Sequence, residues 1–277
     1  MPSHRKKKSP TIPDSIPISV IIPTENEEKT ISKVIAEAQK ISNNTEIIVV
    51  CNGVTDNTSE KAKKMGVNVL EYQTALGHDV GRAIGALISR GEILLFIDAD
   101  FVVPCSTLRE YCLEVIRGSD VVLNSYSGMG RHSIPEAKRA LNLMLGRPDL
   151  KGSSFTSVPH ALSRRAVEII GYENLAVPPK AHVMAVLKRL KISRGKLVQT
   201  NRLNRIRKGR NISIKNLVLG DHVEAICELI EKKGGRGGFA GFRSQRFALN
   251  DVISTPHINQ QHQEGETSNH EEETRSE

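Results

Sequence analysis

The alternation of short apolar runs with stretches of helical periodicity is the feature that most constrains what this chain can fold into. Four runs have the length and the Ile, Val and Leu content of buried strands, at residues 18–23, 46–51, 67–72 and 92–100. Apolar residues at helical spacing occupy the stretches between them, at residues 27–40, 59–65 and 80–90. This order predicts an α/β fold with a parallel, doubly wound sheet and right-handed crossovers.

The rest of the chain is less regular and sets the domain boundaries that we expect. Helical patterns lie at residues 108–117, 135–145, 163–170, 177–190 and 217–233. One further strand pattern lies at residues 120–124. We divide the chain into a disordered basic leader at 1–16, a first half at 17–130, a second half at 131–250 and a disordered acidic tail at 251–277.

The composition predicts a cytoplasmic protein. No apolar run approaches the ~20 residues that a membrane-spanning helix needs. The basic first ten residues lack the apolar segment of a secretory signal. The four cysteines have neither CxxC nor metal-binding spacing, so we expect reduced thiols. The basic leader leaves open a peripheral contact with an anionic inner membrane face.

Charge is spread unevenly along the chain, whose net charge is +8. Removing the +4 of the first ten residues and the −6 of residues 251–277 leaves +10 on the body between them. A basic body favours an anionic partner, such as a nucleotide, a phosphorylated compound or a lipid head group. We expect no nucleic-acid partner, because no aromatic residues interleave with the basic ones and no nucleic-acid-binding motif is present.

Two carboxylates follow the fourth apolar run, in the stretch LLFIDADF at residues 94–101. In an extended strand Asp98 and Asp100 would project to the same side, roughly 6–7 Å apart. A charge that leaves an apolar run is costly unless water, a cation or another partner receives it. Hard carboxylate oxygens suit Mg²⁺ or Mn²⁺, so the pair indicates a divalent-cation site. Two solvated aspartates at a strand end are the alternative.

Polar residues follow the other three strands as well, in PTENEE, NGVTDNT and ALGHDVGRAIG. In doubly wound sheets, ligands bind at the carboxyl ends of the strands. Asn52, Thr55 and Asp56 can hydrogen-bond a nucleobase or a ribose. Arg82 can meet phosphate, and we expect Asp79, in the same segment, to bind the donor as well. Together with the carboxylate pair, these clusters predict a site for a nucleoside diphosphate.

The segments ISVIIPTENEE, VCNGVTDNT and LGHDVGRAIGALISRGEILLFIDADFVVP resemble the N-terminal half of family 2 glycosyltransferases of the GT-A fold, over roughly residues 17–130. The resemblance implies a Rossmann-like, mixed and mainly parallel sheet flanked by helices. It also implies an inverting enzyme that uses a nucleotide-diphospho-sugar and Mn²⁺ or Mg²⁺. Asp98 and Asp100 would form the DxD motif, with Asp100 as the direct metal ligand. Residues 17–130 would bind the donor, and residues 131–250 the acceptor.

The resemblance assigns further donor-binding roles. Pro23, Glu25 and Glu27 fall in the nucleotide-binding first loop. Asn52 falls where the family commonly has an acidic residue that contacts the base. Arg82 falls in the loop near the base and the phosphates.

The second half departs from the commonest family pattern. Many members carry an ED pair whose Asp is the catalytic base, whereas PPKAH stands near that place here. An inverting displacement needs a base near the acceptor hydroxyl, unless the acceptor is itself an anion such as a phosphate. The candidates are His160, His182, Asp221 and His222. We expect Asp221 and His182 as catalytic residues and His222, as the late His of some relatives, as a third metal ligand.

The stretch NRLNRIRKGRN at residues 201–211 is strongly basic. We expect a mobile loop that closes over the diphosphate, with Arg202 and Arg207 stabilising the leaving group. A solvated or membrane-facing segment is the alternative. A second basic cluster, GGRGGFAGFRSQR, could hold a phosphorylated acceptor or a partner.

These features predict a metal-dependent glycosyltransferase that acts on an acceptor hydroxyl or phosphate, with cell-envelope or polysaccharide synthesis as its setting. A non-catalytic nucleotide-sugar-binding protein and a sugar-1-phosphate nucleotidyltransferase are the alternatives. The acidic PTENEE counts against the nucleotidyltransferase, which would want a glycine-rich basic loop after the first strand. The sugar, the base, the acceptor (a sugar, a phosphorylated compound or a lipid-linked one) and the oligomeric state, including a homodimer, stay open.

Overall fold

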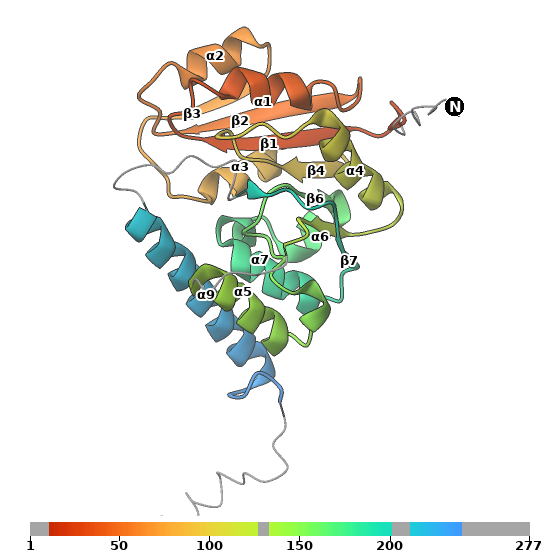
Figure 1. Ribbon diagram of the computed structural model, residues 1–277, viewed down its shortest axis with the longest axis vertical. Helices are drawn as coiled ribbons and strands as arrows, with labels where there is room; N and C mark the ends of the chain where they lie inside the picture. The colour runs from red at the N-terminus through yellow and green to blue at the C-terminus, as the bar shows by residue number, and fades with distance from the viewer. Residues whose placement is uncertain (1–10, 127–132, 201–210, 240–277) are drawn as a thin grey trace, which may run out of the picture. The chain divides into compact units, whose positions relative to one another are not determined.

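The computed structural model describes residues 11–126, 133–200 and 211–239. Residues up to Gly237 form one compact unit, and Gly238–Glu277 form a second, of which only the first two residues are described. The first unit is built on one seven-stranded sheet with the order β3-β2-β1-β4-β6-β5-β7 (Figure 1). Both predicted halves contribute strands to this sheet.

The strands have the following bounds: β1 Ile18–Thr24, β2 Thr45–Asn52, β3 Asn68–Tyr72, β4 Ile93–Phe96, β5 Val121–Leu123, β6 His160–Ser163 and β7 Ile192–Arg194. The α-helices are α1 Ile31–Ala38, α2 Thr58–Lys64, α3 Val80–Ile88, α4 Cys105–Ile116, α5 Ser133–Met144, α6 Arg164–Ile170, α7 Pro178–Leu187 and α9 Asn211–Lys233. Short 3₁₀ turns lie at Pro148–Leu150 and Glu173–Ala176.

The sheet is mixed and mainly parallel, as the family resemblance implied. Strands β1, β2, β3 and β4 are parallel to one another, which confirms the prediction from the first half of the sequence. Strand β6 runs antiparallel between β4 and β5, and the sequence pattern did not predict it. It is a four-residue strand that begins at a histidine, so it lacks the apolar run that identified β1 to β5. The three-residue β7, with the sequence ISR, was not predicted for the same reason.

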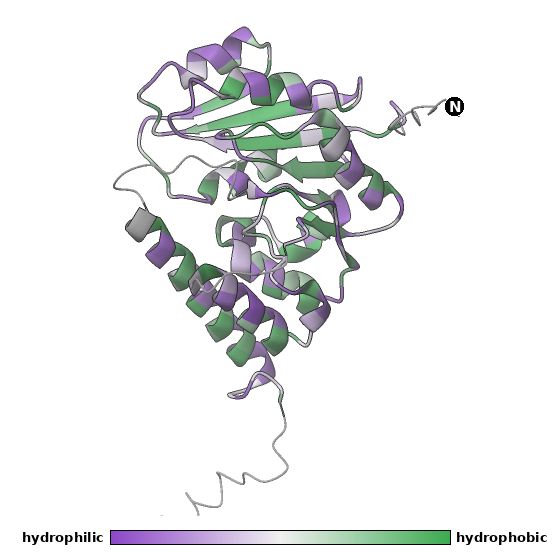
Figure 2. Ribbon diagram, in the orientation of Figure 1, coloured by the Kyte–Doolittle hydropathy of each residue, from purple (hydrophilic) through white to green (hydrophobic). Residues whose placement is uncertain are grey.

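Side chains alternate between two apolar layers, one on each face of the sheet. Ile18, Val20 and Ile22 of β1 pack in a core with α1 and α4, whereas Ile21 packs in a core with α3, α6 and α7. Figure 2 shows the apolar colour of the central strands between these layers. Because successive strand residues point to opposite faces, strands covered on both sides need continuous apolar runs. This explains the sequence signal of the first half.

Helix α3 lies unusually close to β1. An added Cβ at Gly85 would come within 2.5 Å of Ile21 Cγ2, so only glycine permits this approach. The close packing fixes the start of α3, and with it Arg82, beside the carboxyl end of β1.

Helix α9 packs against α5 and α7 in a third apolar cluster that includes Leu141, Val183, Ala225 and Leu229. Lys180, at the start of α7, pairs with Glu224 and Glu228 of α9 at 3.1 and 3.7 Å. The PPKAH segment therefore supplies a structural ion pair at the place where the family pattern led us to seek an acidic pair.

No helix among the described residues is both long and apolar enough to cross a membrane.

Candidate active site

A cleft of about 340 Å³ lies at the carboxyl edge of β1, β2 and β4. It gathers residues from five separate segments of the chain. Its lining residues are Pro23, Thr24, Glu25, Glu27, Asn52, Ala75, Gly77, His78, Arg82, Asp98, Ala99, Asp100 and Ile214. Seven of the thirteen residues predicted from the sequence as site residues are among them, and two of the thirteen, Arg202 and Arg207, lie outside the described residues. The parallel strands explain this convergence, because their carboxyl ends meet at one edge of the sheet.

Arg82 connects two loops of the cleft through its guanidinium group. It is only 7% exposed, with Nη1 2.5 Å from Asp79 Oδ1 and Nη2 3.0 Å from Asp98 Oδ1. Its Nε is buried and has no hydrogen-bond partner among the described residues. Asp79, which is predicted to bind the donor, does not line the cleft. It forms an ion pair with Arg82 and thereby orients the guanidinium group. Arg82 thus carries a fixed positive charge next to the carboxylate pair.

The two DxD carboxylates lie beyond the end of their strand. Strand β4 ends at Phe96, so the prediction of an extended strand through Asp100 is wrong, and both aspartates lie in the bend that follows. Asp100 Oδ1 is buried and accepts no hydrogen bond from the described residues. Burial, reinforced by the charge of Asp98, raises the pKa of Asp100 to about 7. A buried carboxylate oxygen without a donor, beside a second carboxylate, has the chemistry of a ligand for a hard divalent cation.

Asn52 organises the loop that follows β3. Its Nδ2 donates to the carbonyl of Gly77 at 2.7 Å, and its Oδ1 accepts from the amide of Leu76 at 2.6 Å. The turn after β2 depends on Gly53, whose φ of +66° and close approach to the backbone of Ala75 exclude larger residues. Asn52 therefore lines the cleft and also holds in place the loop at residues 75–77, which lines it too.

The loops after β1 and β2 are fastened to each other by side chains. Asn26 Oδ1 accepts from the amide of Thr55 at 2.8 Å, and Asp56 accepts from the amide of Glu28 at 3.2 Å. Thr55 and Asp56, which the sequence suggested as nucleobase or ribose ligands, are thus used in loop packing. These hydrogen bonds between the two loops position Glu25 and Glu27 along the cleft.

Helix α9 brings one further residue to the cleft. Ile214 lines the cleft, and the sequence missed it because the helix was predicted to begin at residue 217. Apolar residues spaced from Ile214 to Val218 could have revealed the extra turn. Asp221 of the same helix is not among the residues that line the cleft. Burial, followed by the charges of Asp79 and Glu224, raises its pKa to about 6.

His222 is 2% exposed, and its Nδ1 donates to the carbonyl of Val218 at 2.6 Å. Its Nε2 is buried and has no partner among the described residues. The described residues contain no group of three or more His, Cys, Asp or Glu side chains that could hold a metal ion. The structure therefore does not bring His222 together with Asp98 and Asp100, and its ligand role stays a prediction. Arg202 and Arg207 lie outside the described residues.

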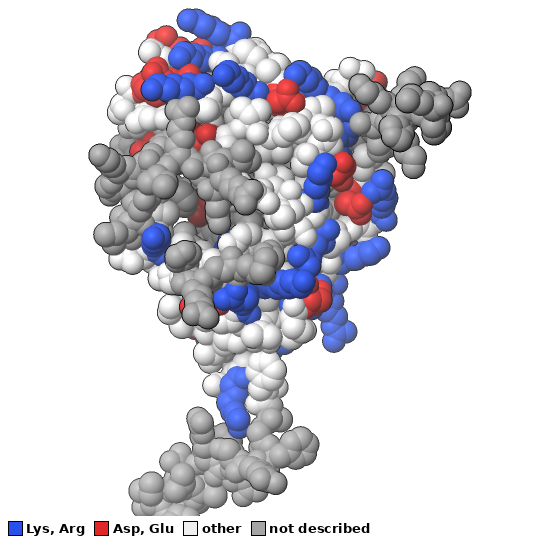
Figure 3. Space-filling model, viewed as in Figure 1, with Lys and Arg blue, Asp and Glu red and all other residues white. Residues whose placement is uncertain are grey.

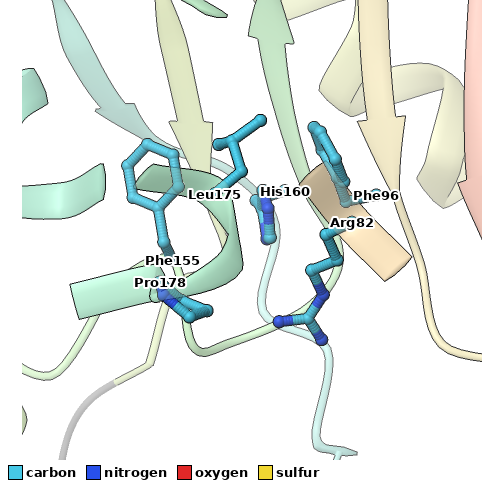
Figure 4. Close-up of a pocket in the computed structure, with 6 residues that line it drawn as sticks. All are labelled: Arg82, Phe96, Phe155, His160, Leu175 and Pro178. Carbon is cyan, nitrogen blue, oxygen red and sulfur yellow. The ribbon is translucent and has the colours of Figure 1, made fainter. Parts of the chain in front are cut away.

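The two other candidate histidines, His160 and His182, are buried and do not line the open cleft. His182 is fully buried; its Nε2 donates to Asn142 Oδ1 at 2.6 Å, and burial, with smaller contributions from nearby positive charges, lowers its pKa to about 3. His160 stacks on Phe96 with ring centres 4.9 Å apart. Figure 4 shows His160 and Arg82 facing the same small pocket, which Phe155 and Pro178 close on the other side.

Charged side chains outside the cleft form ordinary surface pairs. Over α1 and α2, Figure 3 shows basic and acidic groups side by side. They include Lys61 with Glu28 at 3.8 Å and Lys63 with Glu71 at 2.5 Å. On this part of the surface the basic side chains therefore lie beside acidic ones.

Residues 19–164 match the family model described as glycosyl transferase family 2. Over 130 residues the chain is 29% identical to a dolichyl-phosphate hexose transferase of Haloferax volcanii, a match that covers 47% of this chain and 57% of the relative. Over 98 residues it is 34% identical to a glucosyl-3-phosphoglycerate synthase of Mycolicibacterium paratuberculosis, covering 31% and 29% of the two chains. The matches thus span little more than half of the first relative and less than a third of the second.

Solved structures of glucosyl-3-phosphoglycerate synthase from Mycobacterium tuberculosis have a similar fold. The complex with Mn²⁺, UDP-glucose and phosphoglyceric acid gives a TM-score of 0.57 at 20% identity and covers 82% of each chain. The complex with UDP gives 0.59 at 22% identity, also over 82% of each chain. At this level of identity the likeness concerns the fold, which is the Rossmann-like GT-A arrangement.

Proposed function

This chain belongs to glycosyl transferase family 2, and from that membership we propose that it transfers a sugar from a nucleotide-diphospho-sugar to an acceptor hydroxyl or phosphate. The observation that carries the proposal is the single cleft that gathers Pro23, Asn52, Arg82, Asp98 and Asp100 at one edge of the sheet. Two relatives are named as sugar transferases or synthases, and solved structures of similar fold bind UDP-glucose with Mn²⁺.

Asp100, with Asp98 beside it, would hold the Mn²⁺ or Mg²⁺ ion. The unpartnered, buried Oδ1 of Asp100 supports this choice. Such an ion, when bound, neutralises charge on the donor diphosphate and on the leaving nucleoside diphosphate. The cavity has room for the remaining ligands to come from water and phosphate oxygens.

Arg82 would act on the same diphosphate. Its ion pairs with Asp79 and Asp98 hold the guanidinium group in place before the donor arrives. Fixed positive charge that needs no reorganisation is the most effective way to stabilise a leaving group. Asn52 would shape the nucleobase end of the cleft through the loop at residues 75–77.

We propose Asp221, in preference to His182, as the base that accepts the proton of the acceptor hydroxyl during an inverting displacement. The pKa of Asp221 is raised to about 6, so the carboxylate is present at neutral pH and is more basic than an ordinary aspartate. His182 is fully buried and its pKa is lowered to about 3, which makes it a poor proton acceptor.

The test combines binding with turnover. Melting temperatures are measured with UDP-, GDP-, ADP- and dTDP-sugars, with Mn²⁺, Mg²⁺ or EDTA, because a ligand that binds only the folded state raises the melting point. We expect a metal-dependent shift with one donor, lost in Asp100→Ala, together with release of free nucleoside diphosphate. Binding without release would identify a non-catalytic protein instead, and no shift with any donor would refute the proposal.

The anomeric configuration of the product, read by NMR, tests the stereochemistry separately. Inversion of the donor configuration supports the single displacement with Asp221. Retention would contradict that step and would leave the sugar transfer itself intact.

A further inference from the structure

Lys138 carries a buried ammonium group that has no acidic partner among the described residues. Lys138 lies on α5, is 7% exposed and donates from Nζ to Ser157 Oγ at 2.8 Å. The Tyr126 ring centre lies 5.5 Å from Nζ. Among the described residues, no carboxylate acts on this group; the one charge that does is the positive charge of Arg82. Burying an unpaired ammonium opposes folding, so its presence calls for a function.

The surroundings of Lys138 are positive as well. Burial, followed by the charge of Arg82, lowers the pKa of Lys138 to about 8, so the group is still mostly protonated at neutral pH. The pKa values of His182 and His222 are lowered chiefly by burial and further by Lys138, which keeps both rings neutral. Among the described residues, the charge that acts on Lys138 is therefore positive, and a bound anion would supply the negative charge that balances it.

The sheet topology places Lys138 at the edge that carries the aspartates. Ser157 precedes β6 by three residues, and Tyr126 follows β5 by three residues. Because β6 runs antiparallel to both β4 and β5, residues before β6 and after β5 lie at the edge where β4 ends. Asp98 and Asp100 follow β4, so Lys138 and the cation-binding pair share one edge of the sheet.

The segment beside Lys138 is rich in hydroxyl groups that are buried. Ser153 Oγ accepts from the amide of Tyr126 at 3.1 Å and from Arg194 Nε at 3.3 Å. Ser154 and Thr156 share a hydrogen bond of 2.7 Å. Lys138 of α5 and Arg194 of β7 both donate to hydroxyl groups of residues 153–157. Basic side chains and hydroxyls are the donors that a phosphate group requires.

We propose that Lys138, together with Ser157, binds the phosphate group of a phosphorylated acceptor. This inference rests on the proposed function, and it narrows the acceptor from any hydroxyl compound to a phosphate-bearing one. Lys138 would act as a positioning residue that orients the acceptor toward the donor cleft.

The first test uses inorganic phosphate as the probe, on the full chain in EDTA. We expect phosphate to raise the melting temperature above that in chloride of equal ionic strength. Lys138→Met should abolish the shift, and Arg139→Gln, which removes a positive charge from the next position of α5, should keep it. Absence of a shift in the wild-type protein, or its equal loss in both variants, would overturn the inference.

The second test compares acceptors that differ only in the phosphate. Glycerol 3-phosphate is paired with glycerol, and polyprenyl phosphate in detergent micelles is paired with polyprenol, using the donor found in the binding screen. We expect kcat/KM at least ~10-fold higher for the phosphorylated member of one pair. The pair that responds shows whether the phosphate is that of a soluble compound or a lipid. If the enzyme uses the acceptors of a pair, equal kcat/KM for the phosphorylated and the unphosphorylated member would refute the inference.

The kinetics of variants show whether Lys138 positions the acceptor or only stabilises the fold. Lys138→Met should raise the KM for the phosphorylated acceptor roughly 10- to 100-fold, the effect of losing a hydrogen bond to a charged group. Its donor-induced melting shift and its own melting temperature should not fall. A lower melting temperature with an unchanged KM would make Lys138 structural. If Lys138→Met fails to fold, Ser157→Ala should raise the same KM, and an unchanged KM there would refute the proposal. Failure of the donor shift in the wild-type protein would refute the proposed function instead.

Discussion

Two aspartates near Arg82, Asp79 and Asp100, should respond to the same substitution with opposite signs. Asp100 has an oxygen without a partner and a pKa raised from 3.8 to about 7 by burial and by Asp98. Asp79 forms an ion pair with Arg82 at 2.5 Å, and both side chains are almost fully buried. Asn is close in size and shape to Asp and cannot ionise, so each Asp→Asn variant removes the charge alone.

For Asp100 the charge opposes folding when no cation is bound. The raised pKa means that the folded state binds the proton more tightly than the unfolded chain does. The stabilising contribution of the protonated form is therefore complete below pH 4 and is lost as the pH rises to about 7. Ionising this carboxyl in the folded state costs up to about 4 kcal/mol at pH 8, and water penetration reduces this to about 2–4 kcal/mol.

We therefore expect Asp100→Asn to raise the free energy of unfolding by about 2–4 kcal/mol at pH 8 in EDTA, with a gain that shrinks toward pH 4. Asp79→Asn should lower it by about 3 kcal/mol at the same pH, because it leaves part of the Arg82 charge buried and unpaired. Urea unfolding at pH 4, 6 and 8 measures both. Mn²⁺ should stabilise the wild-type protein and not Asp100→Asn.

The result that would refute this reasoning is an Asp100→Asn variant that is less stable than the wild-type protein at pH 8. A gain independent of pH would also refute it, because the charge would then not be its source. Asp149→Asn serves as a surface control, since Asp149 is paired with Arg147 at an exposed site and should change stability by less than about 1 kcal/mol.

Three further predictions follow from the site and its supports. Asn52→Ala should raise the donor KM about 10-fold with little change in kcat, because two hydrogen bonds to the loop at residues 75–77 are lost; unchanged donor kinetics would contradict it. Gly85→Ala should destabilise the fold by about 1–3 kcal/mol in urea unfolding, because its Cβ would meet Ile21 Cγ2, whereas Gly220→Ala, at a position with open space, should not. The transfer rate should fall as the pH drops through about 6, where Asp221 gains a proton, and Asp221→Asn should abolish both the rate and this dependence.

Much of the candidate site could be predicted because its residues follow strands. Asp98 and Asn52 come within two residues of apolar runs that are unmistakable in the sequence, and parallel strands must bring their carboxyl ends together. The role of each residue within the site was harder to predict from the sequence. Thr55 and Asp56 look like ligands in the sequence, yet their hydrogen-bonding groups fasten one loop to another. Nothing local distinguishes a polar side chain that meets a ligand from one that meets a neighbouring loop.

The sequence by itself determined the parallel half of the sheet, the helices that cover it and the edge at which the donor cleft forms, because these depend on periodicities within short windows. Only the tertiary structure decided which charged groups are paired. Arg82 has two acidic partners, from positions 79 and 98, whereas Lys138 has none among the described residues. Partnership and burial depend on strand β6 and helix α5, which are brought to the edge of β4 by contacts between distant residues. Since pKa and affinity for an anion follow from these long-range contacts, no local pattern could have marked Lys138 as different from any other lysine.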